Sequence, residues 1–161
     1  MDTKTKNYKA ALTWLGEEIS NDSLAKNLAV VSRIWNEIWN KGALEASDEV
    51  FTKDYIGHLP IMTVHGPAEF KDMVKVYLMA FPDVHLTVED TFAIGDWVTV
   101  RWTSRGTHHG EMMGIPPRKN KIEMMGISIF RMVAGQVDEE WEGFDTLGMM
   151  QQIGAIPMPT H

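Results

Sequence analysis

The most informative part of the sequence lies near the end of the chain, VDEEWEGFDTLGMMQQIG, residues 137–154. It is predicted to form an alternating strand that runs directly into a short helix, with Asp145 at the junction. Trp141 and Asp145 are four residues apart, so on a regular strand they would point to the same face. If that face is the inner one, Asp145 lies beside a large aromatic ring and is a candidate base with a raised pKa.

Upstream of this stretch, a period of two continues back to Pro82 and predicts an antiparallel meander of four strands. Hairpins are expected around Gly95 and at Ala134-Gly135, and a long loop is expected between the second and third strands. The expected strands cover residues 84–92, 98–102, 122–132 and 136–144, and the loop covers Gly110 to Asn120.

The turn at Ala134-Gly135 decides which residues share a face with Trp141 and Asp145, and two alternatives stay open. A plain two-residue turn would bring one set of the preceding strand to that face: Met124, Ser128 and Phe130. A bulge would bring the neighbouring set instead: Met125, Ile127 and Ile129.

Helical spacing dominates the first half of the chain. One helix is expected over Tyr8 to Ile19, a second over Leu24 to Trp39, and a third opens at Gly66-Pro67, where proline suits the first turn. Short extended segments are expected around Pro60. Helices packed on one face of a strongly bent, mostly antiparallel sheet predict an α+β domain, a cone-shaped barrel that can hold a ligand.

The composition limits the possible functions. The chain has 161 residues, enough for one domain, and a net charge of -7. No nucleic-acid partner is expected, because phosphate contacts need clustered Lys and Arg. The absence of cysteine excludes disulfides and thiolate chemistry. No apolar run is long enough to cross a membrane and the first residues lack a signal core, so a cytoplasmic protein without membrane contact is expected.

Several segments, taken in order, resemble the SnoaL-like polyketide (ester) cyclases of the nuclear-transport-factor-2-like, or ketosteroid-isomerase-like, superfamily. The matching pieces are YIGH at 55–58, GTHHGE at 106–111, GIPP at 114–117, GISIFR at 126–131, EEW at 139–141 and DTLGMMQQIG at 145–154. Arg118 departs from the family pattern, where many relatives have a small residue, and the helix from Tyr8 to Ile19 precedes the usual start. The expected organisation is an N-terminal extension with a helix over 1–23, a SnoaL-like cone domain over 24–156 and a tail over 157–161.

The resemblance implies an activity as well as a fold. The family's characterised cyclases close a ring by intramolecular aldol condensation of a polyketide ester, with no cofactor. They are usually dimeric through the outer face of the sheet, which implies a homodimer here. Their general acid/base is an aspartate at the end of the last strand, and that position falls on Asp145.

Asp145 also has a structural explanation. An aspartate one step before a helix is a good N-cap, worth about 1 kcal/mol without any catalytic role. The two roles can coexist, because a capping carboxylate keeps one oxygen free. Capping lowers the pKa of a carboxyl group, whereas burial near Trp141 would raise it.

Seven further side chains are candidates for the substrate site: Trp35, His58, Trp102, His108, Met124, Phe130 and Trp141. His58 would either bond backbone at a strand end or stabilise a developing enolate oxygen in the pocket. His108 and His109 are adjacent on a strand and face opposite sides, so they cannot clamp one metal ion, and no metal site is expected. Alternation from Trp102 selects His108 as the inward one.

The leading hypothesis is a cofactor-independent enzyme acting on a small hydrophobic carbonyl compound. Asp145 would take a proton from a carbon between carbonyl groups, and neighbouring polar groups would steady the enolate. Two alternatives use the same fold. One is a non-catalytic small-molecule binder, and the other is an isomerase, hydrolase or dehydratase that uses the same aspartate.

Overall fold

The computed structural model describes residues 21–157. Its strands are β1 (Phe51–Leu59), β2 (Met62–His65), β3 (His85–Ile94), β4 (Trp97–Thr107), β5 (Lys121–Val133) and β6 (Gln136–Phe144). Its helices are α2 (Asn21–Arg33), which continues as a π-helical segment over Ile34–Trp39, a 3-10 turn over Leu44–Ala46, α3 (Ser47–Val50), α4 (Gly66–Ala80) and α5 (Thr146–Gln152). The expected helix over Tyr8 to Ile19 lies outside the described residues.

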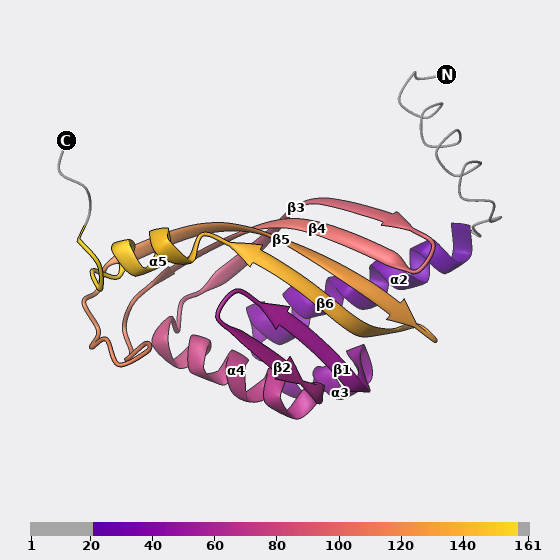
Figure 1. Ribbon diagram of the computed structural model, residues 1–161, viewed down its shortest axis with the longest axis horizontal. Helices are drawn as coiled ribbons and strands as arrows, with labels where there is room; N and C mark the ends of the chain where they lie inside the picture. Colours follow the sequence, from indigo (N-terminus) through magenta and orange to yellow (C-terminus); the bar gives the residue numbers. More distant parts are fainter. Residues whose placement is uncertain (1–20, 158–161) are drawn as a thin grey trace, which may run out of the picture.

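The six strands form one mixed sheet in the order β2-β1-β6-β5-β4-β3 (Figure 1). The predicted meander is present as β3 to β6, and the short extended segments around Pro60 form the hairpin β1–β2. Strand β1 pairs parallel with β6, and the other neighbours pair antiparallel. The α+β class is confirmed, but the sheet stays open and does not close into the expected barrel.

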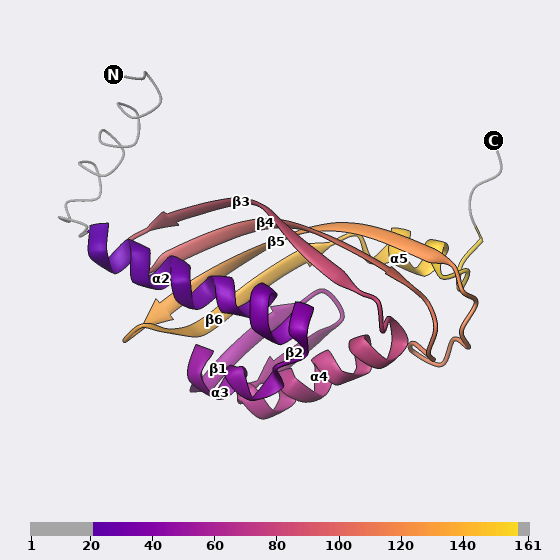
Figure 2. The same ribbon diagram turned by 180° about the vertical axis from the view of Figure 1, so that it is seen from behind.

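Helices α2 and α4 cover one face of the sheet, which is called the inner face below (Figure 2). The segment after α2 buries Ile34, Trp35 and Ile38, and Trp35 meets Phe130 of β5 edge to face at 5.7 Å. Helix α4 begins at Gly66 with proline in its first turn, as predicted, and buries Phe70 and Val74. This packing places an apolar core between the helices and the sheet.

A β-bulge in β6 sets the face of every residue that follows it. Ala134 and Gly135 both have positive φ, 51° and 81°, as a tight two-residue hairpin requires. Met132 pairs with Val137 but Arg131 pairs with Glu139, so Asp138 is the extra residue. The bulge alternative is therefore the one that the structure adopts.

The bulge reverses the expected orientation of β6. Glu140 pairs with Phe130 and Glu142 pairs with Ser128, on the inner face of β5. Trp141 pairs with Ile129 on the opposite face, where it is 36% exposed. The expectation that Trp141 looks inward is wrong, because one inserted residue moves every later side chain to the other face.

Candidate functional site

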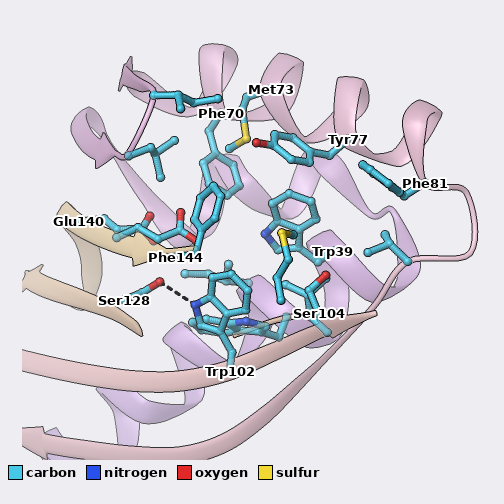
Figure 3. Close-up of a pocket in the computed structure, with 18 of the residues that line it drawn as sticks. Trp39, Phe70, Met73, Tyr77, Phe81, Trp102, Ser104, Ser128, Glu140 and Phe144 are labelled. Atoms are coloured by element: carbon cyan, nitrogen blue, oxygen red, sulfur yellow. Dashed lines mark hydrogen bonds between the residues drawn. The ribbon is translucent and has the colours of Figure 1, made fainter. Parts of the chain in front are cut away.

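A pocket lies between the inner face of β4, β5 and β6 and the helical layer (Figure 3). Aromatic rings make up much of its wall: Trp35, Trp39, Phe70, Tyr77, Trp102 and Phe144. The polar lining consists of Ser104, Ser128, Glu140 and Glu142, together with the Tyr77 hydroxyl. The lining contains no His, Lys or Arg. Two carboxyl groups therefore share an apolar pocket without a positive charge among the lining residues.

Glu140 is the more deeply buried of the two acids, with 4% of its surface exposed. The phenol of Tyr55, from the adjacent strand β1, donates a hydrogen bond of 2.6 Å to its Oε2 atom. The Ser128 side chain of β5 also favours the charged form of this carboxyl group. Burial raises the pKa of Glu140 to about 7, while Tyr55 and Ser128 act in the lowering direction.

Glu142 lies two residues further along the same face of β6. Burial raises the pKa of its carboxyl group well above the usual range, and the nearby charge of Glu140 raises it further. Two acids that interact in this way lose their protons in separate steps. At neutral pH the pair thus holds a proton that an exposed glutamate would have lost.

Trp102 forms the floor of the pocket. Its indole N–H donates a hydrogen bond of 3.1 Å to Ser128 Oγ (Figure 3). The ring lies directly over Gly126, the residue opposite it on β5, where a Cβ atom would overlap the indole. Ser128, which the sequence leaves without a role, thus connects Trp102 with Glu140.

Tyr77 of α4 supplies a further polar group of the pocket. Burial, with a contribution from the charge of Glu142, raises the pKa of its phenol to about 12. Its ring packs edge to face on Trp39 at 5.8 Å. Tyr77 is therefore neutral at physiological pH and can donate a hydrogen bond to a bound molecule.

Three of the predicted substrate-site residues line this pocket: Trp35, Trp102 and Met124. Phe130 lies on the inner face but is buried in the core against Trp35 and is absent from the lining. Their roles in substrate binding remain predictions.

His58 and Trp141 lie on the outer face of the sheet. Their rings stack at 5.4 Å, and His58 Nε2 lies 2.9 Å from Glu139 Oε1. Trp141 also meets the Trp97 ring at 5.7 Å. Strand β1 runs parallel to β6 with His58 opposite Trp141, so both predicted residues lie on the outer face of the sheet.

His108 is buried, as alternation predicts, but it is not part of the pocket. It follows β4, where its ring packs beside Phe81 at 5.5 Å. Burial lowers the pKa of the imidazole, which favours the neutral form. Its backbone pairs with Lys119 and Asn120, so it anchors the base of the predicted loop.

Asp145 is exposed and caps helix α5. Its Oδ1 atom accepts a hydrogen bond of 2.8 Å from the Gly148 backbone N–H, and the residue does not line the pocket. Asp145 is therefore an N-cap residue, and the expectation of an inward carboxyl group beside a buried Trp141 is not met. The reason is again the bulge, which directs the end of β6 differently from a regular strand.

Sequence reasoning missed the residues that carry the polar chemistry of the pocket: Tyr55, Tyr77, Glu140 and Glu142. The sequence did contain a signal for two of them: two glutamates that are two residues apart share a face in a regular strand. The expectation that Trp141 lies inward placed both glutamates on the opposite face of the strand.

The fold and its pocket define an α+β domain with a concave and mostly apolar site, and sites of this type in proteins hold small molecules. The model of the SnoaL-like polyketide cyclase family matches residues 29–153. The chain belongs to the SnoaL-like polyketide cyclase family. In the described part of the chain, none of the helices has the length and apolar character that a membrane span needs. Nor do the residues from 21 to 157 gather three or more side chains suited to holding a metal ion.

Relatives of known name agree with this placement. The chain is 28% identical to aklanonic acid methyl ester cyclase DauD of Streptomyces sp. (strain C5) over 132 residues, 81% of this chain and 73% of the relative. A crystal structure from Jannaschia sp. CCS1, named for a SnoaL-like polyketide cyclase, superposes with a TM-score of 0.79 at 25% identity and covers 88% of this chain and 99% of its own. AclR of Streptomyces galilaeus, named as a hydroxylase, gives a TM-score of 0.75 at 26% identity, with 85% and 86% covered.

Proposed function

We propose that this protein is a cofactor-independent cyclase that closes a ring in a small apolar carbonyl compound by an intramolecular aldol-type reaction. The pair Glu140 and Glu142 would supply the general acid and the general base. The observation that carries the proposal is a carboxyl pair, buried at Glu140 and half-buried at Glu142, facing an apolar pocket whose lining has no basic residue. The family and the name of the relative DauD support a polyketide ester as the substrate class.

The chemistry follows from the protonation of the pair. Ring closure needs a carboxylate to remove a proton from a carbon between carbonyl groups and an acid to protonate the oxygen of the attacked carbonyl. With one proton, two adjacent carboxyl groups supply both functions. General acid/base catalysis contributes typically 10²–10⁴-fold, so the remaining acceleration would come from the aromatic walls folding the substrate into a reactive shape.

The test compares three variants on aklanonic acid methyl ester, the compound in the relative's name. Glu140→Gln and Glu142→Gln should each lower the rate of ring closure by on the order of 100-fold or more. Asp145→Asn should keep the rate within a few-fold, because that carboxyl group lies outside the pocket lining. Full activity in both glutamine variants, with loss in Asp145→Asn, would return the catalytic role to Asp145 and overturn the assignment.

Product mass separates cyclisation from the competing reactions. Ring closure keeps the mass of the substrate, dehydration loses water, hydrolysis gains water, and hydroxylation adds oxygen. A ligand that binds and is recovered unchanged after long incubation would support a binding protein instead. The mass measurement therefore distinguishes the reaction class even if the first ester tested is a poor substrate.

A homodimer is also part of the proposal. The outer face of the sheet exposes a group of large apolar side chains: Trp97, Met125, Ile127, Ile129 and Trp141. These residues come from three neighbouring strands, β4, β5 and β6. A contiguous apolar surface of this kind is typical of a protein–protein interface. A second copy of the chain is the partner that the family resemblance favours.

A further inference from the structure

In the hydrogen bonds around Glu140, the neighbouring groups donate and the carboxyl group accepts. The indole N–H of Trp102 can only donate, and it donates to Ser128 Oγ at 3.1 Å. The Ser128 hydroxyl has a single proton, and Ser128 lowers the pKa of Glu140. On the other side, the Tyr55 hydroxyl donates to Glu140 at 2.6 Å. Glu140 therefore accepts a hydrogen bond from Tyr55 and is also influenced by the Ser128 hydroxyl, an arrangement that favours the ionised carboxylate.

Glu142 has no comparable hydrogen-bond donors that would stabilise its charged form. None of the side-chain hydrogen bonds among the described residues reaches its carboxyl group, and its pKa is raised by burial and by the charge of Glu140. The titratable groups that face the pair are Tyr55 of β1 and Tyr77 of α4, both neutral at physiological pH. A carboxyl group without donors in an apolar pocket favours the protonated form.

We propose that the chain Trp102–Ser128–Glu140–Tyr55 divides the pair into two fixed roles, with the negative charge on Glu140 and the proton on Glu142. Tyr55, Ser128 and Trp102 are then positioning residues that act through Glu140. The assignment of the proton follows from these contacts alone, whereas its use in ring closure rests on the function proposed above.

In the reaction, Glu140 accepts the proton of the carbon between two carbonyl groups. The electron pair of that C–H bond forms the new C–C bond at the second carbonyl carbon. The oxygen of this carbonyl takes the proton of Glu142 as its π bond breaks. Transfer of a proton from Glu140 back to Glu142 restores the starting state, so no oxidant, reductant or co-reactant is consumed.

The proton assignment can be tested on the free protein by infrared spectroscopy of the carboxylic acid C=O stretch. At about pH 8, exposed carboxyl groups are ionised, so a remaining band reports a buried acid. The wild type should show this band, and Glu142→Gln should remove it. Glu140→Gln should keep the band but shift its titration to lower pH, because the neighbouring negative charge is gone. Glu123→Gln, an exposed acid paired with Arg105, is the matched control and should change nothing.

The role of the donors is tested in the Glu142→Gln background, where only Glu140 remains. Adding Tyr55→Phe should raise the titration midpoint of Glu140 by about one pKa unit or more, because a donor to the charged form is lost. Tyr77→Phe, which removes a pocket phenol that does not bond Glu140, should leave the midpoint in place. Ser128→Ala provides a second donor variant if Tyr55→Phe does not fold.

Two results would overturn the proposal. One is a band that persists at about pH 8 in Glu142→Gln, which would place the proton on Glu140. The other is a Glu140 midpoint that neither Tyr55→Phe nor Ser128→Ala moves, which would make the donors merely structural. Both readouts are independent of turnover, so an inactive protein with the expected spectra would refute the proposed function and leave the proton assignment standing.

Discussion

Tyr55 and Glu140 join the parallel pair of strands β1 and β6 through a buried hydrogen bond of 2.6 Å between phenol and carboxyl group. Tyr55 is also packed against the Phe51 ring at 4.3 Å and is fully buried. A tyrosine held in this way cannot readily turn away from its acceptor. The contact therefore keeps one carboxyl group of the pocket in a single position.

The buried acids should make the protein less stable as the pH rises. The pKa of Glu140 is raised from 4.5 to about 7 in the folded state, and that of Glu142 is also raised, so the folded state binds more protons than the unfolded state above about pH 4.5. Stability then falls with increasing pH through this window, by on the order of a few kcal/mol. Urea unfolding between about pH 5 and pH 8 measures the slope. Replacing both acids by glutamine should flatten it, and an unchanged slope in that double variant would contradict the prediction.

Loss of the Asp145 cap should affect stability and leave the pocket intact. Asp145→Ala removes the acceptor of the Gly148 N–H and should cost about 1 kcal/mol in the free energy of unfolding. Asp145→Asn keeps an oxygen acceptor and should cost less. Denaturant unfolding at neutral pH gives both values. Equal stability of the Ala variant and the wild type would show that the cap contributes nothing.

The contact between Gly126 and Trp102 should not tolerate a methyl group. Gly126→Ala would force the indole away and break its hydrogen bond to Ser128, at a cost of about 1–3 kcal/mol for overpacking. Gly143→Ala is the matched control, since a Cβ there meets no atom within 4 Å. Unfolding free energies of the two variants should differ clearly. Equal values would mean that Trp102 can move without loss.

The outer face should govern assembly. Ile127 is 48% exposed in the middle of the apolar surface, and a charge there should turn a dimer into a monomer, because interface cores exclude charged residues. Sedimentation of Ile127→Asp at micromolar concentration measures this change. Met79→Asp, at an exposed position of α4, provides the control and should stay dimeric. A monomeric wild type under the same conditions would count against the homodimer.

Local patterns in the sequence were sufficient for most of the fold. The alternation after Pro82 predicted strands β3 to β6, and Gly66-Pro67 located the start of α4. The family resemblance, carried by segments such as GIPP at 114–117, is confirmed by the match over residues 29–153. The strands and the helix start follow from local patterns, and the family match follows from the order of the motifs. Both kinds of feature can be read from the sequence alone.

The composition of the site depends on the pairing between strands, which no single segment of the sequence shows. The sequence determined that residues 139 to 142 alternate on a strand, but the pairing of Arg131 with Glu139 decided which of them face the pocket. Asp138 can be recognised as a bulge only against its partner strand, because a bulge is a mismatch between two registers. The hydrogen bond from Tyr55 likewise requires β1 to pair with β6 across 85 positions of sequence. The pairing between strands, and not the composition, therefore determines that the acids in the pocket are at positions 140 and 142 and not at position 145.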